Sequence, residues 1–222
     1  MSAEPDESPE HASTRERLIE AARVLFLRQG YEATSISEIL REAVVNSGSL
    51  YYLFKTKEAL LLAVLDKYCD MLYPAVFDHA FARYSDPIER IFAVLGGYRQ
   101  MLLMTDFRQG CPIGNLALEM SERSDLARQK IALNFEGWRV AIRKLLEESG
   151  DWLPGAVDRD RLATFILTVM EGAVMQCRAY RTIEPYDASV AMLRDYVDRL
   201  MADAWTEAGE ASRRPRGEAH AD

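Results

Sequence analysis

The sequence is poor in the residues on which catalytic triads and metal sites most often depend. Only three of its 222 residues are histidines, and two of them, His11 and His220, lie near the ends of the chain. A histidine-based metal site or a Ser-His-Asp triad therefore lacks its parts. Gly96-Gly97 is an isolated pair inside a helical pattern rather than a phosphate-binding loop. We expect no enzyme activity, no bound metal and no cofactor.

Cysteine is equally scarce, and its distribution argues against disulfide bonds. Cys69, Cys111 and Cys177 are odd in number and far apart in the sequence, which is typical of a reducing compartment. No uninterrupted apolar run reaches the roughly 18 residues that span a bilayer, and the acidic start MSAEPDESPEH lacks the pattern of a signal peptide. We expect a cytoplasmic protein with no membrane partner.

Basic residues are fewer than acidic residues in the whole chain, but they outnumber them in one N-terminal segment. The net charge is −8, yet residues 14–57 hold seven basic and five acidic side chains, a local charge of +2. The first ten residues hold four acids and no base. Because the nucleic-acid backbone is anionic, a basic segment in an acidic chain favours a DNA-binding end. A solvated face of mixed charge would have a similar composition.

Apolar residues recur at intervals of three and four along nearly the whole chain, and no strand-like alternation occurs between turn residues. This pattern predicts an all-α fold of about nine helices. We assign residues 1–12 to a disordered tail, 13–57 to a three-helix N-terminal domain, 58–207 to a larger C-terminal helical bundle and 208–222 to a second disordered tail. A linker helix from about residue 56 joins the two domains.

Capping residues and prolines set the expected helix boundaries. We expect the first helix to begin at Ser13, the linker helix to be interrupted at Pro74, and the last helix to begin at Asp187 or Ala188 and end near Trp205.

Two short helices with a turn between them stand out within residues 35–54. Ser35 and Glu38 form a capping box at the start of the first helix, and Asn46 is a good N-cap for the second. The second helix begins with small hydrogen-bonding residues and carries Leu50 and Phe54 at helical spacing. This pattern predicts a helix-turn-helix with one face free to touch a partner.

The runs TRERLIEAARVLFLRQGYEATSISEILREA and GSLYYLFKTKEALL, from Thr14 to about Leu62, resemble the N-terminal domain of the TetR/AcrR family of bacterial transcriptional regulators. Two residues depart from the family pattern: Val44 stands where a turn glycine is usual, and Leu40 where a small alanine usually packs. A β-branched residue at positive φ is strained. Either the turn follows a different path, or the two helices cross with more space between them.

The resemblance implies a set of DNA-contacting residues around the second helix. Such a helix lies in the major groove, while flanking groups hold phosphates and set the register. Ser47 and Ser49, with Tyr52, would read base edges, and Gly48 would permit close backbone approach. The remaining predicted DNA-binding residues are Thr34, Ser35, Asn46, Tyr51, Lys55, Thr56 and Lys57. Since few side chains suited to bidentate base contacts are present, we expect indirect readout to contribute to specificity.

The C-terminal bundle is expected to bind a small-molecule effector, because its adaptable methionines and aromatic residues are typical of an apolar pocket. The predicted ligand-binding residues are Tyr98, Met101, Cys111, Asn115, Glu119, Trp138, Phe165, Met170 and Gln176. Ordinary core packing is the alternative for each of them. Cys111 precedes a helix start, where the helix dipole favours a thiolate, so it is either a redox sensor or a plain buried thiol.

The resemblance also implies a homodimer. Small residues in the middle of an apolar stripe let another helix approach closely, and a second stripe runs along the last helix. The predicted interface residues are Gly172, Ala173, Val190, Leu193, Val197 and Leu200, with packing inside one chain as the alternative. A twofold dimer would prefer a palindromic DNA site.

These expectations combine into one functional hypothesis, a ligand-responsive repressor that a small molecule releases from a palindromic operator. The alternative is a helical small-molecule or thiol-redox sensor in which Val44 and Leu40 have weakened DNA binding. The two differ in whether replacing the predicted DNA-contacting residues abolishes DNA affinity while ligand binding persists.

Overall fold

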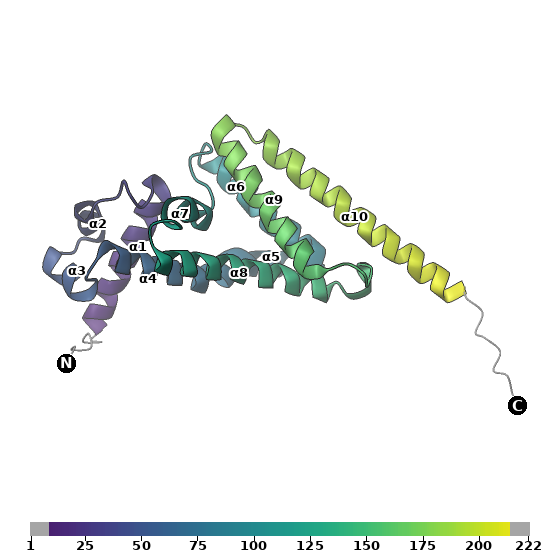
Figure 1. The fold of residues 1–222 in the computed structure, drawn as a ribbon, viewed down its shortest axis with the longest axis horizontal. Coiled ribbons are helices and arrows are strands. Elements are labelled where there is room, and N and C mark those ends of the chain that lie inside the picture. Colours follow the sequence, from purple (N-terminus) through teal and green to yellow (C-terminus); the bar gives the residue numbers. More distant parts are fainter. Residues whose placement is uncertain (1–8, 214–222) are drawn as a thin grey trace, which may run out of the picture.

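The computed structural model describes residues 9–213 of the chain, and it is all-α (Figure 1). Within this range there is no strand, and ten α-helices occur together with one π-helical segment and one 3₁₀ turn. The predicted fold class is therefore confirmed. The additional helix arises because the chain around Pro74 forms a π-helical segment and then a further short helix.

Three helices and the start of a fourth form the N-terminal part of the molecule. They are α1 (Pro9–Gln29), α2 (Ile36–Ala43), α3 (Ser47–Leu53) and α4 (Lys57–Met71). Helix α1 begins four residues before the predicted start at Ser13, so residues 9–12 belong to a helix and not to a tail. The rest of the predicted N-terminal tail lies outside the described residues.

The chain continues through a larger set of helices. They are η1 (Leu72–Phe77), α5 (Asp78–Arg83), α6 (Pro87–Met104), α7 (Pro112–Met120), α8 (Asp125–Glu148), η2 (Gly150–Trp152), α9 (Arg159–Tyr180) and α10 (Glu184–Arg213). The last helix begins at Glu184, three residues before the earlier of its two predicted starts, and continues to Arg213 instead of ending near Trp205. Residues 208–213 are therefore helical, and the remainder of the predicted C-terminal tail lies outside the described residues.

Local capping explains why α2, α3 and α4 begin where the sequence predicts. Asn46 Oδ1 accepts the backbone N–H of Ser49, and Thr56 Oγ1 accepts that of Ala59. Asp86 caps α6 just before a proline at its first position. Each cap satisfies a backbone donor that has no partner inside its own helix, so the helix start depends on residues within one turn.

Two hydrophobic cores hold the helices together. One joins η1, α5, α6 and α8–α10, and includes Phe77, Leu145 and Ile166. The other joins α1–α4 and extends into the second half of the chain through Ile113 and Leu116 of α7 and the first turns of α8. Helix α7 thus packs with the N-terminal helices, although it lies far along the sequence from them.

Helix α9 is the one described helix with the length and apolar composition of a membrane span, and 39% of its most apolar stretch is buried in the molecule. It packs against α8 and α10 (Figure 1). A core helix has the same composition, because it must bury apolar residues on more than one side.

Candidate DNA-binding surface and ligand pocket

The elbow between α2 and α3 keeps the backbone path that a glycine would take. Val44 has φ 54° and ψ 52°, in the left-handed region, and its N–H bonds the carbonyl oxygen of Arg41 at 3.3 Å. The N–H of Val45 bonds the carbonyl oxygen of Leu40 at 3.1 Å. Of the two alternatives, a different turn path is therefore not the one that the structure has, and the β-branched side chain is held in a strained conformation with 80% of its surface exposed.

Helix α3 presents a small polar face beside two aromatic rings. Ser47 and Gly48 are exposed in its first turn, and Tyr51 and Tyr52 are 51% and 46% exposed. On the opposite side, Leu50 and Phe54 are buried in the N-terminal core. The helix therefore has one face anchored by apolar packing and one face available for contact.

Two of the predicted DNA-contacting residues have structural roles inside the chain. Thr34 is 1% exposed, and its hydroxyl donates to the carbonyl oxygen of Gly30 at 2.7 Å. The Lys57 ammonium donates to the carbonyl oxygen of Tyr31 at 2.5 Å and lies 4.0 Å from the centroid of the Tyr31 ring. Burial lowers the pKa of Lys57. Both residues fix the connection between α1 and α2. Thr34 has almost no exposed surface that could meet a phosphate, whereas Lys57 is half-buried and its phosphate contact stays a prediction.

Ser35, Asn46 and Thr56 are N-caps whose side-chain oxygens already accept backbone N–H groups. The capping box predicted at Ser35 and Glu38 is confirmed. Bonds from the N–H and hydroxyl of Ser35 lower the pKa of Glu38 to about 2. These caps orient the helices. The predicted contact residues on the exposed surface are Ser47, Gly48, Tyr51, Tyr52 and Lys55, and Ser49 is half-buried.

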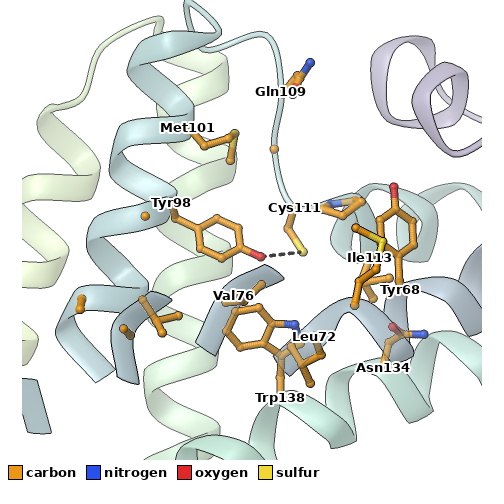
Figure 2. A pocket seen from close by; sticks show the side chains of 17 residues that line it. Tyr68, Leu72, Val76, Tyr98, Met101, Gln109, Cys111, Ile113, Asn134 and Trp138 are labelled. Atoms are coloured by element: carbon orange, nitrogen blue, oxygen red, sulfur yellow. Dashed lines mark hydrogen bonds between the residues drawn. The ribbon is translucent and has the colours of Figure 1, made fainter. Parts of the chain in front are cut away.

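A cavity of about 390 Å³ lies between α4, η1, α5, α6 and α8 and the segment that leads into α7. Figure 2 shows Tyr98 and Met101 reaching into it from α6 and Trp138 from α8, with Cys111 opposite Tyr98. These four were predicted as ligand-binding residues, and the structure brings them together. The remaining lining residues are Tyr68, Met71, Leu72, Val76, Ala80, Ala93, Val94, Gly97, Gln109, Gly110, Pro112, Ile113 and Asn134.

Sequence reasoning missed Tyr68 and Met71 because they lie in the linker helix, which was expected to join the two domains rather than to line a pocket. It missed Asn134 because a polar residue within the pattern of α8 gave no sign of burial. Asn134 is 4% exposed, and its amide donates to the carbonyl oxygens of Leu65 and Lys130, both at 3.0 Å. This side chain ties α8 to α4 at the wall of the cavity.

Five predicted ligand-binding residues lie outside the cavity. Met170 is 1% exposed in the core of the bundle, and Asn115 Oδ1 accepts a bond from Arg178 at 2.5 Å. Phe165 and Gln176 line a surface groove between α9 and α10. Glu119 Oε2 accepts the backbone N–H of Glu32 at 3.1 Å. Their helical spacing was compatible with a pocket, but spacing alone does not say which face of each helix turns toward it.

Cys111 is 3% exposed, and its sulfur accepts the N–H of Gly114 at 3.5 Å at the start of α7. Burial, together with the neighbouring Glu171 carboxyl, raises the pKa of Cys111, so the thiol stays protonated near neutral pH. The helix-dipole argument for a thiolate is therefore wrong, because desolvation outweighs the dipole. Of the two readings of Cys111, the structure favours the buried thiol.

The groove between α9 and α10 offers an apolar surface with small residues in it. Phe165 and Tyr196 meet edge to face at 6.1 Å, and Met192 is 68% exposed. A Cβ at Gly172, which also lines the groove, would meet no atom within 4 Å. Among the other predicted interface residues, Ala173, Leu193 and Val197 are buried in the core of their own chain, and Val190 and Leu200 are partly buried against it. For these five, packing inside one chain is the arrangement that the structure has.

Helix α7 connects the cavity to the N-terminal helices. Its first residues, Pro112 and Ile113, line the cavity. Near its other end, the Glu119 carboxylate approaches Gly30, whose φ of 88° and missing side chain leave room for it. An ion pair between Arg123 and Glu32 adds a second link to the same loop. These contacts join α7 to the loop that leads into α2.

The described residues contain no cluster of three or more His, Cys, Asp or Glu side chains that could hold a metal. The arrangement that the structure does contain is an exposed second helix of a helix-turn-helix, an apolar cavity, and α7, which contacts both the cavity and the N-terminal helices.

Two family models match the chain in its two halves. Residues 18–64 match the model described as bacterial regulatory proteins, tetR family, and residues 87–192 match transcriptional regulator LmrA/YxaF-like, C-terminal domain. A curated relative, the HTH-type transcriptional repressor DhaR of Mycobacterium sp. strain GP1, is 30% identical over 177 residues, which cover 78% of this chain and 86% of DhaR.

Solved structures have the same fold. A TetR transcriptional regulator from Chloroflexus aurantiacus J-10-FL is 29% identical with a TM-score of 0.73, and the match covers 86% of this chain and 97% of that one. The regulatory protein TetR from Rhodobacter sphaeroides is 26% identical with a TM-score of 0.73, covering 81% and 96%.

Proposed function

Because the chain belongs to the TetR family of bacterial transcriptional regulators, we propose that it is a repressor that a small molecule releases from a palindromic operator. The observation that carries this proposal is that Cys111 and Ile113 belong both to the wall of the cavity and to the core of the N-terminal helices. A ligand in the cavity would press on the same packing that positions α3. We assign the protein a cytoplasmic location and no catalytic activity.

In this proposal, α3 enters the major groove with its N-terminal turn facing the bases. Ser47 and Gly48 approach base edges, while Tyr51, Tyr52 and Lys55 contact the sugar-phosphate backbone or nearby bases. The exposed face of α3 supports this assignment. Because it offers short hydroxyls and no guanidinium, sequence-dependent DNA shape contributes to specificity.

The proposed repressor is a homodimer whose partner copy occupies the groove between α9 and α10. Phe165, Met192 and Tyr196 are exposed there beside the small Gly172, and exposed apolar side chains grouped around a small residue favour close helix packing. A twofold axis through this groove would present two copies of α3 to successive half-sites of a palindrome.

Release would proceed through α7. Occupation of the cavity moves the start of α7, and Glu119 transmits the movement to the loop before α2, so the spacing of the two copies of α3 no longer matches the operator. The bond from Glu32 N–H to Glu119 and the ion pair between Arg123 and Glu32 support this path.

A gel-shift series on DNA from upstream of the protein's own gene tests the DNA assignment. Lys55→Ala should weaken retention and reduce the slope of log affinity against log salt by about 0.9, the value for one lost phosphate contact. Lys144→Ala removes the same charge from an exposed position on α8, and it should change neither the retention of DNA nor the salt slope. Absence of sequence-specific retention by the ligand-free wild type at moderate salt would rule out the repressor assignment.

The release path can be tested without a known effector. A Cβ at Gly97 would meet no atom within 4 Å, so Gly97→Leu places a side chain inside the cavity in the way a ligand would. We expect operator affinity to fall about fivefold or more, the lower end of typical allosteric couplings. Adding Glu119→Ala should remove most of that effect, and an undiminished effect in the double variant would exclude Glu119 as the link.

The thiol-redox alternative needs a reactive thiolate in the cavity. Since burial holds Cys111 in its protonated form, we favour reversible ligand binding over oxidation as the release signal.

A further inference from the structure

The wall of the cavity carries no charge. None of its 17 lining residues is Asp, Glu, Lys, Arg or His. The three lining residues that can ionise also stay neutral near pH 7, because burial raises the pKa of Tyr68 to about 12 and raises the pKa values of Tyr98 and Cys111 as well. An ionised ligand would lose its hydration on entering and find no counter-charge among these residues; the buried Glu171 carboxyl beside Cys111 lies outside them, and burial raises its pKa.

Two hydroxyl groups of the wall are poorly satisfied. The buried hydroxyl of Tyr68 has no hydrogen-bond partner within the described part of the chain. The Tyr98 hydroxyl donates to the sulfur of Cys111 at 3.9 Å (Figure 2), and sulfur is a weak acceptor. An oxygen acceptor placed beside this hydroxyl would form the stronger bond. The Tyr98 hydroxyl is therefore a natural donor for one oxygen atom of a ligand.

The rest of the wall suits a flat, polarisable molecule. Tyr98 and Trp138 meet edge to face, with ring centroids 5.8 Å apart, and Met71 and Met101 add thioether surfaces. Gly97 leaves open space against α6, since a Cβ there would meet no atom within 4 Å. The volume of about 390 Å³ is in the range of small-molecule sites.

We propose that the effector is an uncharged, largely aromatic small molecule with an oxygen acceptor that binds the hydroxyl of Tyr98. This inference rests on the proposed function, since it names the chemical class of ligand that the regulatory cavity takes. Gly97 sets how deep such a molecule can lie, and Tyr98 sets its orientation.

Three probes of one ring system test the inference by calorimetry on the full chain: 2-acetylnaphthalene, naphthalene and 2-naphthoate. We expect the neutral ketone to bind most tightly and 2-naphthoate to bind about 100-fold more weakly, because its charge would be buried without a partner. Tyr98→Phe should weaken binding of the ketone about three- to tenfold, which is the effect of losing one hydrogen bond, and should leave the affinity for naphthalene unchanged.

Gly97→Leu should abolish binding of the ketone and naphthalene. Gly96→Leu is the matched control, because Gly96 also has open space around its Cβ position but lines a separate groove between α6 and α10. Carboxylate binding as tight as that of the ketone would overturn the proposal. So would equal losses for ketone and naphthalene in Tyr98→Phe, or no binding of any probe to the wild type.

The same samples in the gel-shift assay separate this inference from the repressor assignment. If the ketone binds through Tyr98 while the protein never retains DNA, the ligand class stands and the repressor function fails. If DNA is retained but only 2-naphthoate binds, the repressor function stands and the ligand class is wrong.

Discussion

Replacing Val44 with glycine should stabilise the protein, although it removes a side chain. A residue with a Cβ held in the left-handed region costs about 1–3 kcal/mol, and Val44 lies there with φ 54°. Glycine relieves this strain but loses about 0.5–1 kcal/mol through the greater freedom of the unfolded chain.

The packing lost with Val44 is small. Full burial of a valine is worth about 1.5–3 kcal/mol. Because the side chain is 80% exposed, about a fifth of that, or roughly 0.3–0.6 kcal/mol, is lost. With each contribution near the middle of its range, the net gain is about 0.8 kcal/mol, which corresponds to a rise in Tm of about 2–3 °C for a chain of this length.

Thermal unfolding followed by circular dichroism measures the effect. Glu42→Gly is the matched control, since Glu42 is exposed in α2 with ordinary helical geometry, and glycine there should cost about 1 kcal/mol. If Val44→Gly lowers Tm by as much as Glu42→Gly does, the backbone at Val44 stores no strain.

Three further changes follow from local chemistry. The pKa of Glu38 is held at about 2, below its ordinary 4.5, so the stability it contributes is complete above pH 4.5 and is lost as the pH falls toward 2; Glu38→Gln should flatten the acid limb of a helicity titration over this range. Iodoacetamide should label the exposed Cys69 before the buried Cys111, as read by mass spectrometry, and the reverse order would contradict the protonated thiol. Asn46→Ala leaves the N–H of Ser49 without its cap and should lower the free energy of unfolding by about 1 kcal/mol in a urea titration, whereas Asn46→Gly should lower it by only a few tenths.

The DNA-binding end of the molecule was the part most open to prediction. The caps at Ser35, Asn46 and Thr56 and the buried positions of Leu50 and Phe54 all agree with the structure. Each depends on residues within about one helical turn, so the information lies in a short stretch of sequence.

Lys57 has a hydrogen-bond partner that no local sequence pattern predicts. Its place at the start of α4 predicts a phosphate contact, and the structure adds a hydrogen bond to the carbonyl oxygen of Tyr31, 26 residues away. The cavity also depends on contacts between distant residues, because its wall joins α4, α6 and α8. The periodicity of each helix predicted a buried stripe but not the neighbour that it faces, so four of the nine predicted ligand residues line the cavity.

The sequence by itself determined the all-α fold, most helix starts and the helix-turn-helix, because capping, turn geometry and apolar periodicity are properties of neighbouring residues. The tertiary structure alone decided which side chains meet at the cavity, that the Cys111 thiol stays protonated, and that Glu119 ties α7 to the loop before α2. Burial and long-range hydrogen bonds arise only when distant helices pack, so neither the electrostatics of the cavity nor its connection to the DNA-binding helices can be read from a local pattern.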